Sequence, residues 1–235
     1  MSQPIVNQPG QVPAPISGVP DGLETLTNLD QFLIKKQMNC IELLTRQILQ
    51  KPNKYIIQDS SEQQLSLAVE ESEFCNRQLK KRNRAFKMHI KDQAERNVIE
   101  IERPGIICPV ICAKQENVTV RAPLTGEILG FVRVDYFCFC LFPKITICDK
   151  DHNEIFILYP SVWKLLFCSY SICKNIEIPI NDMNGNKCGS LDQLYPGLCS
   201  MAIKFRLSVP IDLDVKLKAT LLGAVFMIDF AIYEY

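Results

Sequence analysis

The end of the chain, Asp212 to Tyr235, reads DLDVKLKATLLGAVFMIDFAIYEY and decides the fold. From Ala219 to Ile228 no side chain is charged, and apolar residues lie on every side of a 3.6-residue helix. Such a helix needs apolar surroundings in all directions, which either a lipid bilayer or the protein interior supplies. A membrane span needs about 20 apolar residues, whereas Lys216, Lys218 and Asp229 leave only about ten uninterrupted.

We therefore expect a helix that is buried within the protein, with a membrane span as the alternative. Lysine side chains near a helix end can reach polar surroundings, but Asp229 would lie unpaired in hydrocarbon at a high cost. The rest of the chain should then enclose this helix. The residues expected at its centre, or in the span under the alternative, are Ala219, Gly223, Phe226, Ile228 and Asp229.

Composition favours one large cytosolic domain without a strong overall charge. The chain has 235 residues, a size that single all-β domains reach, and 26 Lys and Arg balance 26 Asp and Glu. A net charge of zero gives no global field that attracts nucleic acid, so we expect no nucleic-acid partner. The start, MSQPIVNQPGQ, has no signal-peptide pattern, which predicts reduced thiols for the 11 cysteines. Because no CxxC pair occurs and only His89 and His152 supply imidazoles, we expect no zinc site.

Patterns along the chain predict a tail, a short helix and then many strands. Residues 1–21 are rich in Pro, Gln and Gly, and we expect a disordered tail there and one domain over residues 22–235. Asp21 and Glu24 approximate a capping box, and apolar residues follow at helical spacing, so Gly22 to Gln31 is expected to be helical.

Apolar and polar residues then alternate with the two-residue period of strands. The segments with this alternation are residues 55–57, 65–69, 86–90, 98–101, 118–120, 128–134, 145–147, 155–158, 176–180 and 203–209. Roughly a dozen short strands without helices between them indicate a mainly β protein, either an antiparallel barrel or a sandwich. A closed barrel would accommodate the apolar C-terminal helix as the filling of its interior.

The sequence contains no motif of a known catalytic chemistry. GxSxG, the P-loop and HExxH are all missing. Glu100 and Glu102 place two carboxylates on one face of a strand, but alternating charges on an exposed strand explain them adequately. We therefore expect that the protein is not an enzyme.

Several stretches together resemble the phospholipid scramblase family. They are GLETLTNLDQFLI (22–34), NKYIIQDS (53–60), LAVEES (67–72), VIEIERP (98–104), PKITI (143–147) and DLDVKLKATLLGAVFMIDF (212–230). The resemblance implies a tubby-like fold, a closed barrel of about twelve strands around a C-terminal hydrophobic helix. It also implies a protein at the cytoplasmic face of the plasma membrane that moves phospholipids in both directions between leaflets, without ATP, when calcium rises.

The family resemblance also implies membrane anchoring through palmitate on cysteines that follow the ERP motif. Here the segment reads ERPGIICPVIC, so Cys108 and Cys112 are the expected palmitoylation sites. One acyl chain binds a membrane only marginally, whereas two signals give stable anchoring. Alternatively, both cysteines are small apolar residues buried at the start of a strand.

Calcium is the second cofactor that the resemblance implies, bound by an acidic segment that ends in the DLD before the helix. In a register without gaps, the family's first and third acidic positions fall on Met201 and Ile203, which cannot bind calcium. Asp212 and Asp214 remain as candidate ligands, but a hard cation needs about six to eight oxygen ligands. We therefore expect a weak response to calcium; the alternative role of both aspartates is favourable charge at a helix N-terminus.

A reader of phosphoinositide or anionic-lipid headgroups without transport activity is the alternative function, because tubby-like folds also resemble such modules. The basic run Lys80, Lys81, Arg82 and Arg84 could contact anionic headgroups, since each cation near a membrane adds about 1 kcal/mol. A solvated hairpin loop is the other interpretation of this run. Under either function the expected partner is a phospholipid membrane, with no small-molecule substrate other than lipid, and self-association stays open.

Overall fold

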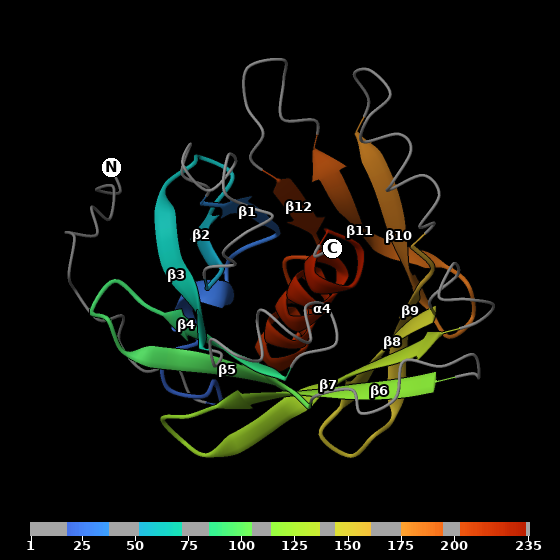
Figure 1. Cartoon of the computed structure of the whole chain (residues 1–235), viewed down its shortest axis with the longest axis horizontal. Helices are drawn as coiled ribbons and strands as arrows, with labels where there is room; N and C mark the ends of the chain where they lie inside the picture. The colour runs from blue at the N-terminus through green and yellow to red at the C-terminus, as the bar shows by residue number, and fades with distance from the viewer. Residues whose placement is uncertain are drawn as a thin grey trace, which may run out of the picture.

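The computed structural model covers the whole chain and describes residues 18–37, 52–71, 85–104, 114–136, 144–160, 175–194 and 203–233. Strands form a ring around one central helix (Figure 1). The strands are β1 (Gln31–Lys36), β2 (Lys54–Gln58), β3 (Gln64–Glu71), β4 (Phe86–Lys91), β5 (Asn97–Arg103), β6 (Lys114–Ala122), β7 (Glu127–Tyr136), β8 (Lys144–Asp149), β9 (Glu154–Leu158), β10 (Ile176–Asp182), β11 (Lys187–Leu194) and β12 (Lys204–Ser208).

Every strand pairs antiparallel with its neighbours in sequence, and β12 pairs with β1 to close the barrel. Along β1 the buried side chains are those of Phe32, Ile34 and Lys36, which alternate with partly exposed ones. The same alternation in most other strands turns one face toward the interior. The expected mainly β fold, a closed barrel of about twelve antiparallel strands, is therefore confirmed.

The prediction of a helix from Gly22 to Gln31 is wrong. The structure has a 3-10 turn, η1 (Glu24–Leu26), and then β1. Gly22 has a φ of 88°, and its backbone N–H donates to Oε2 of Glu24 at 2.9 Å, so this carboxylate closes a tight turn instead of capping a helix. Beyond it, the pairing of β1 with both β12 and β2 outweighs the local helical spacing.

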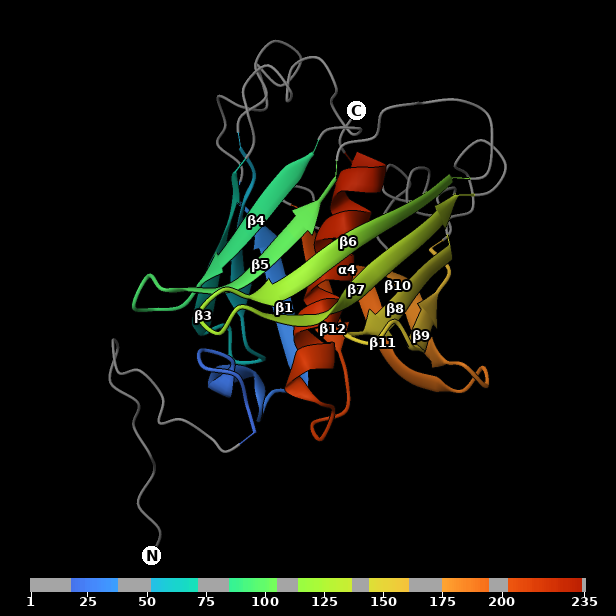
Figure 2. The same cartoon turned by 90° about the horizontal axis from the view of Figure 1, so that it is seen from below.

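The C-terminal helix α4 (Val215–Tyr233) runs through the inside of the barrel (Figure 2). Residues 218–230 are all buried, including Ala219, Gly223, Phe226, Ile228 and Asp229, and α4 lies nearest to β7, β8 and β6. The expectation of a helix buried in protein is confirmed. Among the described helices, none is both long and apolar enough to cross a membrane.

The barrel has two different ends. At one end lie short turns (residues 59–63, 92–96, 123–126, 150–153, 183–186 and 209–214), which we call the turn rim. At the other end, called the helix-end rim, β1, β3, β5, β7, β9 and β11 finish and β2, β4, β6, β8, β10 and β12 begin. Asp229, near the end of α4, contacts Lys36 and Tyr55, which belong to the helix-end rim.

Four hairpins at the turn rim share one turn, which begins with an aspartate. In each, Oδ1 of Asp59, Asp92, Asp149 or Asp182 accepts the backbone N–H groups two and four residues later, at 2.8–2.9 Å. The residue three positions later has a positive φ and is Glu62, Glu95, His152 or Gly185. The side-chain acceptor thus replaces a backbone partner for two N–H groups, as in an Asx turn.

Stability should fall at acid pH because of these turns. Hydrogen bonds from Asn153 and from Asn186 hold the pKa of Asp149 and of Asp182 below the ordinary value of about 3.9. A carboxylate with a depressed folded pKa stabilises the fold above its unfolded pKa, and this contribution is lost as pH falls through the folded value. We expect Asp149→Ala with Asp182→Ala to lower Tm at pH 7 and to flatten the decline of Tm below pH ~4. If the Tm of this double variant fell below pH ~4 as steeply as that of the wild type, the two aspartates would not be the cause of the decline.

Candidate functional site

A buried ion pair joins the end of α4 to the barrel wall. Oδ2 of Asp229, whose side chain is 0% exposed, lies 2.7 Å from Nζ of Lys36 and accepts a hydrogen bond from the Tyr55 hydroxyl at 2.5 Å. Lys36 is the last residue of β1, and Tyr55 is the second residue of β2, so both donors come from adjacent strands. A carboxylate that would be costly in hydrocarbon is thus paired inside the protein.

A second buried ion pair lies in the same layer of the barrel. Nη2 of Arg103 is 2.9 Å from Oε2 of Glu116, and both side chains are buried. The Arg103 guanidinium lies 5.9 Å from the ring centroid of Phe86, which stacks on Phe230 of α4 at 3.9 Å. The interior at the helix-end rim therefore holds buried charges of both signs, and the pair of Asp229 with Lys36 ties α4 to the barrel wall.

At the turn rim, the ammonium group of Lys218 is held by backbone carbonyls. Its Nζ donates to the oxygens of Leu26, Thr27 and Ile211 at 3.0, 2.9 and 2.8 Å. Burial lowers the pKa of Lys218, because the charged form loses solvation that the carbonyls replace only in part. The lysine interrupts the apolar run in sequence, but in the barrel it ties α4 to η1 and to the turn before the helix.

Gly223 marks a close approach between α4 and the wall. A Cβ atom there would lie 2.8 Å from Cγ2 of Val120 and 3.4 Å from Cγ2 of Val132. A side chain at this position therefore requires β6 or β7 to move, and the helix packs here through its backbone.

The two candidate calcium ligands lie at the start of α4. Oδ1 of Asp214 accepts the backbone N–H of Lys216 at 2.8 Å, which is a helix cap, and Asp212 is exposed. Ile203, at one of the family's acidic positions, packs against the hydrophobic core. Within the described ranges, no three His, Cys, Asp or Glu side chains are grouped so that they could hold a metal ion. The capping role expected as the alternative for Asp214 is therefore present.

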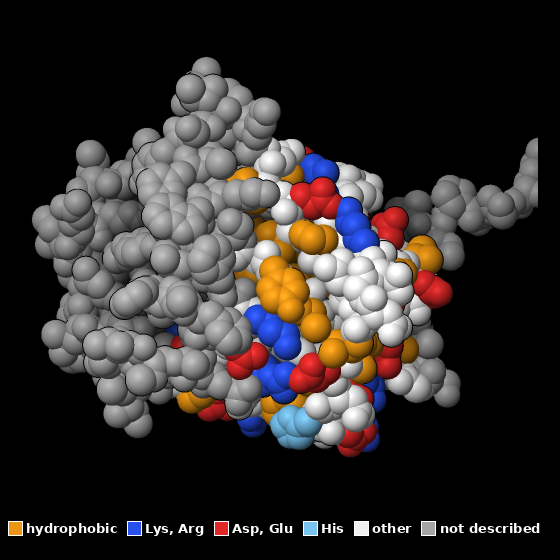
Figure 3. Space-filling model, turned by 90° about the vertical axis from the view of Figure 1, so that its right-hand side faces the viewer, with side chains coloured by type: hydrophobic (Ala, Val, Ile, Leu, Met, Phe, Trp, Pro, Cys, Tyr) orange, Lys and Arg blue, Asp and Glu red, His pale blue; other side chains and the backbone are white. Residues whose placement is uncertain are grey.

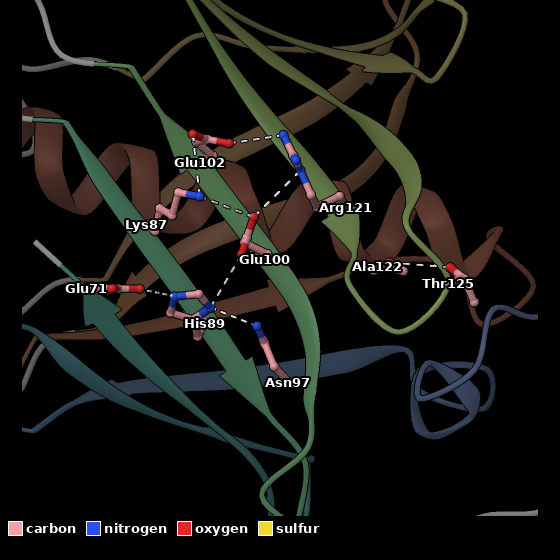
Figure 4. A network of polar contacts seen from close by, with 9 residues as sticks. All are labelled: Glu71, Lys87, His89, Asn97, Glu100, Glu102, Arg121, Ala122 and Thr125. Carbon is pink, nitrogen blue, oxygen red and sulfur yellow. Dashed lines mark hydrogen bonds and ion pairs between the residues drawn. The ribbon is translucent and has the colours of Figure 1, made fainter.

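A network of charges covers the outer face of β3 to β6 (Figure 4). Nε2 of His89 is 2.7 Å from Glu71, and Nη2 of Arg121 is 3.0 Å from Glu102. Glu100 lies between them, 3.7 Å from Nδ1 of His89 and 3.7 Å from Nε of Arg121. Glu100 and Glu102 thus have basic partners on the neighbouring strands, as expected for alternating charges on an exposed strand.

Another outer wall, seen in Figure 3, mixes apolar, basic and acidic side chains. On β7 to β9, Phe131 stacks on His152 with ring centroids 4.1 Å apart, and Arg133 pairs with Glu154. Tyr159, which follows β9, is 60% exposed. Among the side chains that the structure describes on these two walls, none forms the grouping of nucleophile, base and oxyanion donors that acyl or phosphoryl transfer needs.

Several predicted site residues lie outside the described ranges. They are Cys108 and Cys112, the basic residues Lys80, Lys81, Arg82 and Arg84, and Met201. The described strand ends on either side of each of these segments belong to the helix-end rim. The sequence predictions for palmitate and for lipid contact thus fall on connections of the same rim.

Comparison with known proteins agrees with this architecture. A family model described as Scramblase matches residues 10–235. The chain belongs to the scramblase family. It is 32% identical to phospholipid scramblase 1 of Rattus norvegicus over 247 residues, which cover 99% of this chain and 70% of that protein.

Other relatives of this scramblase-family chain show similar coverage. It is 34% identical to phospholipid scramblase 2 of Bos taurus over 248 residues, with 99% of this chain and 80% of that protein covered. It is 31% identical to phospholipid scramblase family member 5 of Homo sapiens over 231 residues, covering 94% and 80%. No solved structure matches the chain.

The sequence patterns did not reveal the buried charges at the helix-end rim. A usable signal is nevertheless present, because Lys36 and Arg103 continue the inward series of β1 and β5, and Glu116 begins that of β6. A charged residue at an inward position of a strand predicts a buried partner. Which residue that partner is depends on how the barrel closes, so it cannot be predicted from the neighbouring sequence.

Proposed function

We propose that this scramblase-family chain moves phospholipids in both directions between the leaflets of a membrane, without ATP. The observation that carries the proposal is the match to proteins named phospholipid scramblases along nearly the whole chain, from the strands to the end of α4. The matched length includes the helix that fills the barrel. The catalytic motifs that hydrolysis would need have no counterpart in the sequence.

The test is reconstitution of the purified chain into phosphatidylcholine vesicles that carry a fluorescent phospholipid in both leaflets. Dithionite, which does not cross the bilayer, should quench only the outer half without protein and clearly more than half with it, in the absence of ATP. An encapsulated dye controls for leakage. Quenching that stops at half, together with binding to anionic vesicles, would instead support a headgroup reader without transport.

We further propose that the protein acts at the cytoplasmic face of the plasma membrane, with phospholipid as its partner. Membrane association is expected from its relatives, while the particular membrane follows from the family resemblance. Lys80, Lys81, Arg82 and Arg84 are proposed contacts for anionic headgroups. Whether one copy suffices is open to test by the dependence of lipid movement on the number of copies per vesicle.

Palmitate on Cys108 and Cys112 is the proposed covalent anchor. Because one acyl chain gives only marginal binding, we expect either single change to Ser to release most of the protein from the membrane fraction, and the double change to release nearly all. Hydroxylamine, which cleaves thioesters, should have the same effect. Cys188→Ser, at a partly exposed position on β11, serves as the matched control. Membrane fractionation that survives the double change would place the anchor elsewhere.

Calcium is proposed to act weakly through the segment before α4. Asp214 already caps the helix, and the partly buried Ile203 packs against the core, so few oxygen ligands are available there. Calorimetry should show no saturable heat at micromolar calcium, because affinity is expected to be weaker than about 10⁻⁴ to 10⁻³ M. Tight binding by the wild type that disappears in Asp212→Ala would contradict this expectation.

A further inference from the structure

Lysines recur where strands begin at the helix-end rim. Lys54, Lys144 and Lys204 are the first residues of β2, β8 and β12, and Lys87 is the second residue of β4. We call these four residues the lysine collar. Because the strands that begin at this rim are spread around the barrel, the collar follows most of its circumference.

The described ammonium groups of the collar face outward and are largely unneutralised. Lys54 is exposed, and Lys144 and Lys204 are partly exposed. No ion pair involves these three lysines within the described part of the chain, whereas Lys87 lies 3.7 Å from Glu102. In β12 and β1, Lys204 stands directly opposite Lys35, and Glu62, 3.0 Å from Nζ of Lys35, offsets part of this pair of like charges.

Carboxylates near this rim are already engaged by other bases. Glu71 lies 2.7 Å from His89, Asp135 lies 3.8 Å from Arg133, and Glu177 pairs with Lys187. Lys54, Lys144 and Lys204 are therefore neutralised only in part, because Glu154 and Glu62 lie within electrostatic reach of Lys144 and Lys204 without forming an ion pair with them.

The turn rim has the opposite sign. Its turns carry seven acidic residues, Asp59, Glu62, Asp92, Glu95, Asp151, Asp212 and Asp214, against Arg96 and Lys150. A protein with zero net charge thus has one basic and one acidic end. Single apolar residues are exposed there as well, among them Met183 and Ile211, which stand in separate turns.

The segments of sequence between the strands that meet at the helix-end rim carry a net positive charge, as the collar does. They hold nine basic residues, Arg46, Lys51, Arg77, Lys80, Lys81, Arg82, Arg84, Lys164 and Lys174, against Glu42 and Glu73. Each of the six stretches also contains cysteine, namely Cys40, Cys75, Cys108 with Cys112, Cys138 with Cys140, Cys168 with Cys173, and Cys199. The six stretches of the turn rim contain none.

We propose that the barrel docks end-on to an anionic phospholipid surface, with the lysine collar against the headgroups and the turn rim in the aqueous phase. This orientation rests on the proposed function, which makes a phospholipid bilayer the partner. Phosphate and carboxylate oxygens of the headgroups accept hydrogen bonds from the ammonium groups. Most of the acidic turns lie about one strand length away, roughly 17–20 Å, and screening over about 8 Å removes most of their repulsion. Glu62 is the exception, because its carboxylate lies 3.0 Å from Lys35 and so offsets part of the charge of Lys204.

The test compares two pairs of lysines on the same chain by binding to vesicles of phosphatidylcholine with and without phosphatidylserine. Each cation at such a surface is worth about fivefold in the dissociation constant, so Lys54→Gln with Lys204→Gln should weaken binding to the serine-containing vesicles about 10- to 30-fold. The matched control is Lys91→Gln with Lys150→Gln, which removes two cations next to the turn rim. We expect the control to change binding by about twofold or less.

Hydrogen exchange on bound wild-type protein provides a readout that needs no variant. Amides at the starts of β2 and β12 should exchange more slowly on serine-containing vesicles, and those of turns 92–96 and 183–186 should not change. If both double variants lost vesicle binding equally, or if amide protection were confined to the turn rim, the proposed orientation would be wrong. Lipid movement by the wild type would be unaffected by either result. If the wild type bound neither kind of vesicle, the proposed function itself would fail.

Discussion

Gly223→Asp is expected to abolish folding of the barrel. A Cβ at this position already lies 2.8 Å from Val120, and a carboxylate would extend further into the contact between α4, β6 and β7. An unpaired buried carboxylate costs several kcal/mol, against a total stability of roughly 5–15 kcal/mol. We expect circular dichroism to show no cooperative thermal transition for this variant.

Two controls separate the buried charge from the substitution itself. Gly223→Ala adds only the crowding, which costs about 1–3 kcal/mol and is offset in part by the better helix propensity of Ala. Gly185→Asp makes the same change in a turn where a Cβ meets nothing within 4 Å. Its φ of 87° is one that Asp tolerates better than most residues, so this variant should fold. A Gly223→Asp protein that unfolds at the wild-type temperature would show that α4 is not the core.

Asp229→Ala is expected to destabilise the protein by about 3–5 kcal/mol, because the change takes the carboxylate away from the buried ammonium of Lys36. The Tyr55 hydroxyl loses the same acceptor. Denaturant unfolding should show this loss in the midpoint with little change in slope.

The double variant Lys36→Met with Asp229→Leu tests whether the loss comes from the charge left behind. Replacing both partners of a buried pair by apolar residues is often neutral or stabilising, so most of the stability should return. Lys35→Met, one residue away on the outer face of β1, is the matched control and should change little. If the double variant were as unstable as Asp229→Ala, the pair would not be the cause.

The helix and most of the strands could be predicted from the sequence because each depends on local pattern. The charged residues that flank Ala219 to Ile228 limit the apolar run to a length that fits a protein interior, and the structure buries that run. The alternation over Phe86 to Ile90, for example, indicates both a strand and its inward face, as β4 shows. Period-two alternation is local information and survives in the folded barrel.

Features that depend on distant partners could not be predicted. β1 was not predicted, and its first residue, Gln31, lay in the expected helix, because the pairing of Phe32 with Leu207 lies far outside any local window. β11 was not predicted, since Cys188 to Ser190 offers little apolar alternation and its strand follows from pairing with β10 and β12. Likewise, in the sequence Lys218 only interrupts an apolar run, and its role could not be predicted without the backbone carbonyls that bind its ammonium group.

We expect the barrel to remain closed around α4 while phospholipids move, because the buried contacts of Asp229 and Lys218 hold the helix inside. Hydrogen exchange measured by mass spectrometry on vesicles, under conditions where dithionite shows lipid movement, tests it most directly. We predict that amides of α4 from Ala219 to Phe230, and of the neighbouring β7 and β8, stay as protected as in solution. Loss of protection in β7 and β8 once lipid movement begins would mean that the helix leaves the barrel to enter the bilayer, and would contradict the claim.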